Sequence, residues 1–541
     1  MKKFLAILLT LVMVLACCAT MATAETATTT ISVLGYERNK GENSQGFMAN
    51  RDTQVVWQAA EKMFAENGVA FEFEIIADSE QYKTTVQTRL AAAHDLPDMF
   101  YGGVVDTVTL LNLADNGTIL KINEIMELTK GDAYNYWFGG EGDAARLLVS
   151  NEEGDFYWVP RIQINQLDGT NAGTSMCICI RKDWLEKLDM AIPTTLDEFT
   201  AALQAFQDND VNGNGIKDEI LLVNTNGFAT GMNLWFGIPT TTSDSIGINL
   251  TEQTVSSAWY NENIDEYFAY VQKLVNDGLL SRDYIGTSTS SSAAFSGNQV
   301  AAMEYYPVGT YQEAAVIAGG CADAYYIGIE PIEAVAGTKP FVSEETPYLV
   351  YMQHCVSKNA ADKLEAIAAV YDTIYSAEFL DLMTWGVEGK TYEVLEDGTK
   401  KSLVGTLSTQ QKFVEGLAKD DEIWRFFLPN VHHNERKLEM QNKIDAGYPE
   451  KVDYEWAVHG HTPLTPNDNT SYYALATIEE LEILDEYQTD LVTASQELAT
   501  ALSLGEIAVE DIPEQVEELK ALGLDEVLAV RTAQYNRGIG K

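Results

Sequence analysis

Two kinds of hydrophobic spacing alternate near the start of the chain. Residues 30–34 and 69–76 are short runs with the apolar pattern of β-strands. Residues 55–67 place apolar side chains at helical spacing, and residues 82–93 read as a second helix. Strands that alternate with helices in this way predict an α/β fold with a largely parallel sheet.

The same alternation returns after residue 175. Residues 175–180 read as a buried strand, 183–188 as a short helix and 193–208 as a longer one. Thr194 or Thr195 can cap that helix, and the acids that follow complement its dipole. Further helices are expected near 263–277, 360–376, 477–503 and 514–521, and further strands at 300–305 and 347–356.

The first residues have the three-part pattern of a secretory signal peptide. Two lysines precede an apolar run at 4–16, and the small residues at 22–24 offer a cleavage site. The run is shorter than the roughly 20 residues that span a bilayer. A second reading takes 14–17 as a lipobox with Cys17 as the lipid anchor. We therefore expect export to the extracellular face of the membrane, anchored at Cys17 or secreted after Ala24.

Length and charge narrow the class of protein. Without residues 1–24, 517 of 541 residues remain, which is too many for one core, so two or more lobes are expected. The full chain has 35 basic and 81 acidic side chains, and loss of two lysines leaves 33 against 81, a net charge of −48. Such a chain repels nucleic acid, which needs a basic partner surface.

The cysteines do not form a disulfide framework. Cys177 and Cys179 would lie on one side of a strand two residues apart, an awkward geometry for a disulfide, and Cys321 and Cys355 are far apart in sequence. We expect all four to be buried small hydrophobes.

Residues 210–219 read DVNGNGIKDE, with oxygen-bearing side chains at alternate positions and glycines between them. Calcium takes six to eight oxygen ligands, and the glycines allow the loop to curl around it. The loop therefore predicts a structural calcium site, since no water-activating base converges on it. The predicted ligands are Asp210, Asn212, Asn214, Ile216 through its carbonyl, Asp218 and Glu219.

Two registers of this loop compete. A register that starts at Asp208 matches the EF-hand pattern formally and puts Glu219 at its last position, but it places Ile216 where an oxygen ligand is usual. The register that starts at Asp210 is preferred, although it has Leu221 in place of the usual final Glu. A polar turn without metal is the remaining alternative.

Several motifs together resemble family 1 extracellular solute-binding proteins of bacterial ABC importers, in particular the LipO-like lipoprotein branch and the alginate-binding periplasmic proteins. The resemblance implies two α/β lobes around a hinge with the ligand in the interlobe cleft, the same calcium ligands, importer membrane subunits as partners, and a monomer. The lipobox departs from the family pattern. The motifs are LPDMF at 96–100, YWVP at 157–160, RKDWLEKL at 181–188, IPTTLDEF at 192–199 and WGVEGKTY at 385–392.

The expected lobes are discontinuous in sequence. Residues 25–165 and 330–388 are assigned to lobe 1, and residues 166–329 and 389–541 to lobe 2, which carries the loop at 210–219. No repeat and no long Pro/Gly linker separates them, so several short crossings are expected to join them.

Aromatic residues are candidates for contact with a sugar, because the apolar faces of sugar rings lie on aromatic planes. Most aromatic side chains belong to cores, and Trp184 is expected to pack among the leucines of its helix. The better candidates lie at strand ends or beside glycines. They are Tyr36, Tyr101, Trp158, Trp235, Tyr306 and Trp385.

The leading hypothesis is a carbohydrate-binding component of an ABC importer, without catalytic residues. The sequence has no HExxH, G-x-S-x-G or Walker motif. Two alternatives stay open at this point: a secreted carbohydrate-active enzyme, and a binding protein for a solute other than sugar, such as a peptide.

Overall fold

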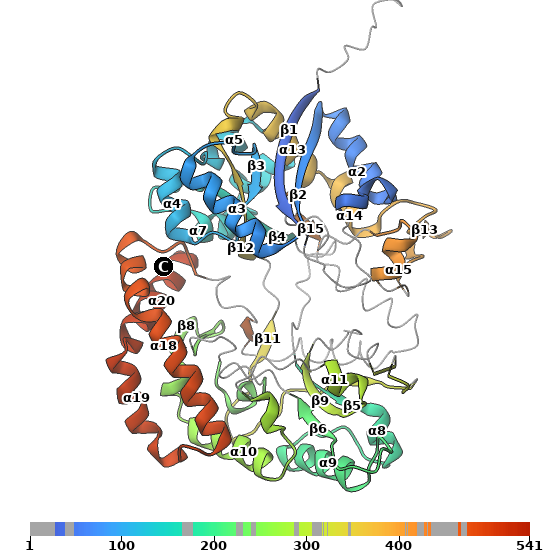
Figure 1. Cartoon of the computed structure of the whole chain (residues 1–541), viewed down its shortest axis with the longest axis vertical. Helices are drawn as coiled ribbons and strands as arrows, with labels where there is room; N and C mark the ends of the chain where they lie inside the picture. The colour runs from blue at the N-terminus through green and yellow to red at the C-terminus, as the bar shows by residue number, and fades with distance from the viewer. Residues whose placement is uncertain are drawn as a thin grey trace, which may run out of the picture.

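Two β-sheets, each with its own hydrophobic core, divide the computed structural model into two lobes (Figure 1). The structure describes residues 28–37, 48–164, 177–222, 231–239, 245–285, 292–305, 316–317, 319–321, 323–344, 348–405, 407, 409–418, 427–429, 431–433, 464–466 and 473–541.

The first lobe is built on a six-stranded sheet. Its strands in spatial order are β15 (Val431–His433), β4 (Trp158–Ile164), β12 (Tyr348–Val356), β3 (Met99–Tyr101), β1 (Thr29–Tyr36) and β2 (Val69–Ile76). β1 pairs in parallel with β2 and β3, whereas β12 is antiparallel to β3 and β4. The parallel pairs follow from the helices that connect successive strands, as the alternating pattern predicted.

Helices cover this sheet and close its core. The helix between β1 and β2 buries Trp57 and Phe64, and Asp78 caps the next helix, where its side chain accepts a hydrogen bond from Gln81 N. The helices of the lobe are η1 (Met48–Thr53), α2 (Val55–Glu66), α3 (Ser79–Ala92), α4 (Thr107–Asp115), α5 (Ile122–Leu128), α6 (Asp132–Phe138), α7 (Asp143–Val149), η5 (Lys358–Ala360), α13 (Leu364–Tyr375) and α14 (Ala377–Trp385).

The second lobe has a four-stranded sheet. Its strands in spatial order are β10 (Tyr326–Gly328), β5 (Cys177–Arg181), β9 (Val300–Tyr305) and β6 (Ile220–Leu222). β5 is antiparallel to β9 and β10, and β6 is parallel to β9. The helices are α8 (Lys182–Lys187), α9 (Leu196–Asp208), η2 (Met232–Phe236), η3 (Ala258–Tyr260), α10 (Ile264–Asn276), η4 (Arg282–Tyr284), α11 (Ser292–Ser296), α18 (Ile478–Leu504), η8 (Val509–Asp511), α19 (Ile512–Ala521) and α20 (Leu524–Gly538).

The start of α9 follows its sequence closely. Thr195 is the N-cap residue, and its hydroxyl accepts a hydrogen bond from the backbone N of Glu198 at 3.2 Å. The expected core residue of the preceding helix, Trp184, is fully buried. Both predictions are confirmed, because capping and amphipathic spacing are local properties that the sequence carries directly.

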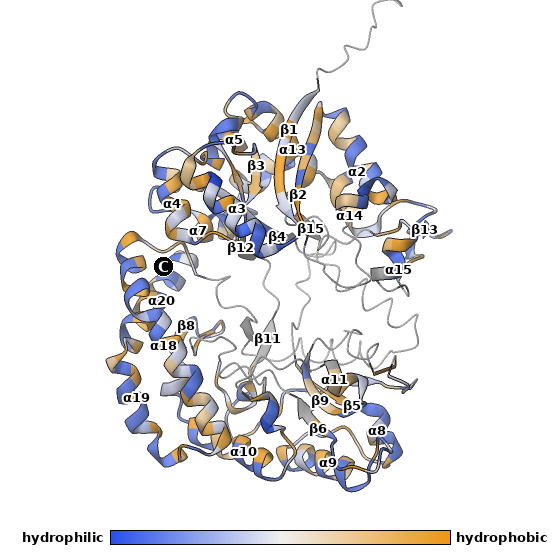
Figure 2. Ribbon diagram, viewed as in Figure 1, coloured by the Kyte–Doolittle hydropathy of each residue, from blue (hydrophilic) through white to orange (hydrophobic). Residues whose placement is uncertain are grey.

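Short strand pairs complete the described structure. They are β7 (Ile246–Asn249) with β8 (Thr254–Ser257), β13 (Tyr392–Val394) with β14 (Lys400–Ser402), and β11 (Val342–Glu344) with β16 (Leu464–Pro466), and α15 (Thr409–Val414) follows β14. Figure 2 shows β1 and β2 mostly in hydrophobic colours, whereas the C-terminal helices mix both colours, as helices with one apolar face do.

Two segments lie outside the lobes that the sequence boundaries gave them. Residues 431–433, assigned to lobe 2, pair with β4 in the first sheet. Ile332, assigned to lobe 1, packs in the core of the second lobe. Both differences arise from pairing and packing with residues distant in sequence, which a local pattern does not contain.

The four described cysteines are free thiols. Cys179 and Cys355 are buried, as expected, whereas Cys177 and Cys321 are half-buried. The sulfur atoms of Cys177 and Cys179 lie 3.7 Å apart. Among the described helices, we find none with both the length and the apolar character needed to cross a bilayer.

Candidate functional site

The carboxyl ends of two parallel strands bring together two of the predicted aromatic residues. Tyr36 ends β1 and Tyr101 ends β3, and their ring centroids lie 5.9 Å apart. The ring of Tyr82 in α3 lies 5.1 Å from the Tyr36 ring. The Tyr82 hydroxyl accepts a hydrogen bond from Tyr101 N at 3.0 Å and donates one to Tyr101 O at 2.8 Å. In open α/β sheets this edge is where ligands bind.

His354 on β12 completes this aromatic cluster. Its ring lies 5.5 Å from that of Tyr101, and burial lowers its pKa to about 3, so the imidazole is neutral at physiological pH. Tyr36 is 9% exposed and Tyr101 4% exposed. Both rings are therefore buried in the core of the first lobe where its sheet ends, and sequence reasoning missed the histidine beside them.

Two predicted sugar platforms lie inside the cores instead. Trp158 is 2% exposed on β4, where it pairs with Cys355 of β12. Trp235 is 3% exposed in η2 and packs edge-on against Phe199 at 5.3 Å. Neither ring offers a face to a ligand in this structure, because tertiary packing buries both sides. The structure thus shows both as core residues, and their contact with a sugar stays a prediction.

Trp385 remains available at the surface. It is half-buried at the C-terminal end of α14, with the Tyr392 ring at 5.9 Å and Lys400 Nζ at 5.8 Å from its ring. Gly386 follows with a φ of +82°, and a side chain there would meet Thr391, so the turn requires glycine. The remaining candidate, Tyr306, lies outside the described residues.

The second lobe contributes a carboxyl group that sequence reasoning missed. Glu304 lies near the carboxyl end of β9 and is partly accessible. Its surroundings exclude most water, which raises its pKa from 4.5 to about 8. The only trace in the sequence is an acid within an otherwise apolar strand, VAAMEY.

This shift predicts a pH-dependent effect of Glu304→Gln on stability. The folded state keeps a proton that the unfolded state releases between about pH 4.5 and 8, so the carboxyl group destabilises the fold as pH rises through that window. We expect Glu304→Gln to raise the melting temperature at pH 8.5 and to change it little near pH 4. Thermal melts across this range, with the exposed Glu330→Gln as control, measure the effect. An equal shift at both pH values would contradict it.

The loop at 210–219 is held together by hydrogen bonds among its own residues. The Asp210 carboxylate accepts from the backbone N of Asn214 at 3.0 Å and of Gly215 at 2.9 Å. The Asp218 carboxylate accepts from the side-chain amides of Asn212 and Asn214, both at 2.9 Å. Four of the predicted ligands are thus linked by hydrogen bonds within the loop, while the Ile216 side chain is 61% exposed.

Glu219 reaches the loop from its C-terminal end. It is 1% exposed, its Oε1 accepts from the backbone N of Asn212 at 3.3 Å, and its Oε2 is buried without a hydrogen-bond partner in the described part of the chain. Burial raises the pKa of this carboxyl. Within the described ranges, no three His, Cys, Asp or Glu side chains form a cluster that could hold a metal ion.

The two registers of the loop differ in their first acid. Asp208 points to Lys217, whose Nζ lies 2.6 Å from Oδ1, and this contact lowers the pKa of the Asp208 carboxyl. Asp210 points into the loop, as its bonds to the backbone show. The geometry favours the register that starts at Asp210.

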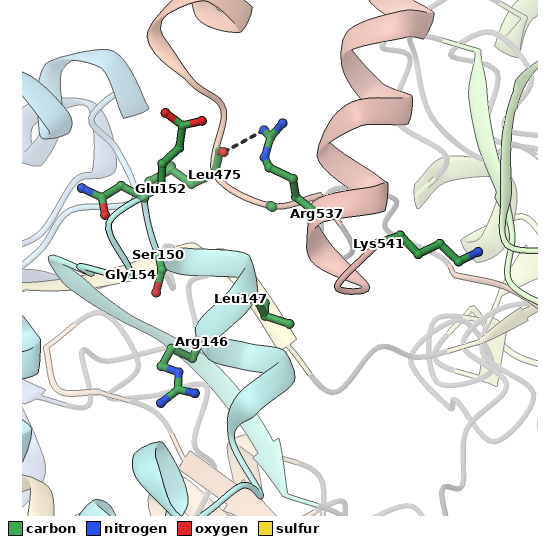
Figure 3. A pocket seen from close by; sticks show the side chains of 10 residues that line it. Arg146, Leu147, Ser150, Glu152, Gly154, Leu475, Arg537 and Lys541 are labelled. Atoms are coloured by element: carbon green, nitrogen blue, oxygen red, sulfur yellow. Dashed lines mark hydrogen bonds between the residues drawn. The ribbon is translucent and has the colours of Figure 1, made fainter.

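A separate cavity of about 360 Å³ lies between residues of the two lobes (Figure 3). Its walls are α7 and the loop after it on one side and the C-terminal helix on the other. The guanidinium of Arg537 in α20 donates hydrogen bonds to both carboxylate oxygens of Glu480, at 2.6 and 2.5 Å, and to the Leu475 carbonyl at 3.1 Å. In Figure 3 the side chains of Arg146 and Lys541 point away from each other, so no convergent charge marks it as a ligand site.

A family model described as bacterial extracellular solute-binding protein matches residues 58–394, more than half of the chain. The fructooligosaccharide ABC transporter substrate-binding protein FusA of Streptococcus pneumoniae is 26% identical over 193 residues, 35% of either chain. Lipoprotein LipO of Bacillus subtilis is 25% identical over 292 residues, 52% of this chain and 54% of LipO. The matches span about a third to a half of these relatives.

Solved structures with the same fold cover nearly the whole chain. An EF-hand mutant of S. pneumoniae FusA in complex with fructo-nystose has a TM-score of 0.69 at 16% identity, over 94% of this chain and 99% of that chain. The alginate-binding protein AlgQ2 without calcium ion has a TM-score of 0.60 at 18% identity, over 94% and 99%. The predicted two-lobe α/β fold is confirmed.

Proposed function

Because this chain belongs to the bacterial extracellular solute-binding proteins, we propose that it captures an oligosaccharide outside the cell and delivers it to the membrane subunits of an ABC importer. The family expected from the sequence motifs is confirmed. The observation that carries the proposal is the pair of tyrosines, Tyr36 and Tyr101, at the carboxyl edge of the first sheet. That edge is the ligand position in open α/β sheets.

Two observations favour an oligosaccharide as the ligand: the aromatic rings in the candidate site and the sugars that related proteins are described as binding. FusA is described as a fructooligosaccharide binder and AlgQ2 as an alginate binder. Tyrosine rings at the end of the first sheet, together with the half-buried ring of Trp385, suit a ligand with apolar faces and many hydroxyls. Closure of the two lobes around the ligand would bury it and provide the form that the importer recognises.

Capture without chemical change is part of the same proposal. The family and its structural neighbours are binding proteins. A thermal-shift panel of oligosaccharides and peptides tests the ligand class, since a ligand that binds only the folded chain raises its melting temperature. A rise with peptides alone would contradict an oligosaccharide ligand.

Trp385 provides a test at the level of one residue. We expect Trp385→Ala to weaken oligosaccharide binding about 10- to 100-fold, because stacking and burial of such a ring contribute on the order of 1 to 3 kcal/mol. Trp385→Phe, which keeps a ring, should lose less. The control is Tyr134→Ala, which removes an exposed aromatic ring from α6. Normal calorimetric affinity of Trp385→Ala would exclude this ring from the site.

The loop at 210–219 is proposed to bind a structural calcium ion. Its donor set consists of carboxylate, amide and carbonyl oxygens, which suits a hard cation. The buried Glu219 Oε2 without a hydrogen-bond partner in the described residues is the kind of group that a cation would satisfy. The FusA structure is described as an EF-hand mutant. The ligands would be Asp210, Asn212, Asn214, the Ile216 carbonyl, Asp218 and Glu219.

Cellular placement follows from the family and, in detail, from the N-terminal sequence. The family is extracellular. We propose that residues 1–24 direct export and that the chain is either lipid-anchored at Cys17 or released after Ala24, acting as a monomer. Mass spectrometry of the mature N-terminus distinguishes a lipidated Cys17 from a chain that begins at Glu25.

A further inference from the structure

Glu304 lies at the end of the second sheet that faces the first lobe. β4 ends at Ile164 in the first sheet, and the next described strand, β5, begins at Cys177 in the second. Cys177 pairs with Tyr305, and Ile178 pairs with Glu304. The last residues of β9 therefore lie beside the point where the chain enters the second lobe, and Figure 1 shows β5 and β9 between α9 and the first lobe.

The Glu304 carboxyl lies in a crowded position, and none of the described residues forms a hydrogen bond with it. Ile178, its cross-strand neighbour, is 1% exposed in the core. Gly231 lies against its other side with a φ of +67°, and a Cβ there would be 3.0 Å from Oε1. Within the described residues, no hydrogen bond or ion pair reaches this carboxyl, and burial alone accounts for its raised pKa. A polar group in such a place usually has a partner.

Resting on the proposed capture of an oligosaccharide, we propose that Glu304 binds a hydroxyl group of a neutral sugar from the second lobe. Glycine at position 231 places no side chain of its own against the carboxyl. The ligand would supply the hydrogen bond that the described protein does not. Glu304 would then face, across the interlobe space, the tyrosine edge of the first sheet.

The chemistry of the carboxyl group favours a neutral sugar over a uronic acid. A hydroxyl both donates and accepts hydrogen bonds, so it pairs with Glu304 whether the carboxyl is ionised or protonated. The carboxylate of a uronate only accepts, so this group pairs with the protonated form of Glu304 alone and is repelled by the ionised form. Because the pKa is raised to about 8, the difference between the two sugars is greatest above that pH.

The test combines affinity and stability for Glu304→Leu and Glu304→Gln, with Glu330→Gln as the control for loss of an acid. Calorimetric titration with kestose and with nystose, both neutral, gives the affinity. We expect Glu304→Leu to weaken binding about 10- to 100-fold while its melting temperature rises, because an unpartnered carboxyl is removed. Glu304→Gln keeps an acceptor and should stay within about threefold of the wild type.

A ligand contact is distinguished from a packing residue because its loss lowers the affinity for sugar while the melting temperature rises. A fall in both affinity and melting temperature for Glu304→Leu would assign Glu304 to packing and overturn the proposal. Unchanged affinity would overturn it as well. In both cases the wild type still binds sugar and the proposed function stands.

The second arm compares a neutral oligosaccharide with oligogalacturonate at pH 8.5. We expect the wild type to bind the neutral ligand at least tenfold more tightly. Tighter binding of oligogalacturonate would overturn the assignment of a neutral sugar. Binding of neither class would contradict the proposed function itself, and the inference would fail with it.

Discussion

Trp235→Ala is expected to lower the free energy of unfolding by about 3 to 5 kcal/mol while leaving the ligand chemistry in place. The ring is 3% exposed, packs edge-on against Phe199, and belongs to the core of the second lobe. Its backbone carbonyl also accepts a hydrogen bond from Ala334 N at 3.1 Å, which links η2 to the segment after β10. Removal of the indole leaves a cavity that this core cannot fill by collapse.

Urea unfolding of Trp235→Ala and Trp385→Ala compares the free energy of unfolding that each variant loses. Trp385 is half-buried at a helix end, so its loss should change stability much less and affinity much more. A Trp235→Ala variant with wild-type stability and weakened sugar binding would restore this residue as a platform and contradict the packing described here.

Removal of calcium is expected to produce the second large effect. A ligand that binds only the folded state stabilises it by about 4 kcal/mol at a thousandfold excess over its dissociation constant. A calcium chelator should therefore lower the melting temperature of the wild type markedly. Asp218→Ala should abolish the response, because this carboxylate lies at the centre of the loop and is bonded to both asparagine amides.

Asp208→Ala and Asp210→Ala form a matched pair that decides the register. Asp208 is paired with Lys217 outside the loop, whereas Asp210 points into it. Asp208→Ala should keep the chelator response, and Asp210→Ala should lose it. Identical melting temperatures of calcium-loaded wild type and of wild type freed of bound metal would contradict the calcium site.

Local features were predictable from the sequence. The Thr195 cap of α9, the burial of Trp184 and the parallel pairing of β1 with β2 all follow from patterns within a few dozen residues. The same holds for the long helix α18, which begins after Thr477 with a capping box that includes Glu480.

Features that depend on distant contacts were not predictable. Trp235 precedes Phe236 and Gly237, a pattern typical of a loop, but η2 carries it into the core. β15 pairs with β4, from which it is separated by most of both lobes in sequence. Glu304 was missed because the sequence shows only one acid in an apolar strand. Its contact with Gly231, which is distant in sequence, becomes visible only in the structure.

The most direct test of the central claim is a calorimetric titration of the mature protein with defined neutral oligosaccharides, followed by chemical analysis of the recovered sugar. We expect saturable binding of one ligand per chain and recovery of the sugar with its length and reducing ends unchanged. New reducing ends would show an enzyme. Absence of binding to every oligosaccharide, together with binding of a peptide or another solute, would contradict sugar capture.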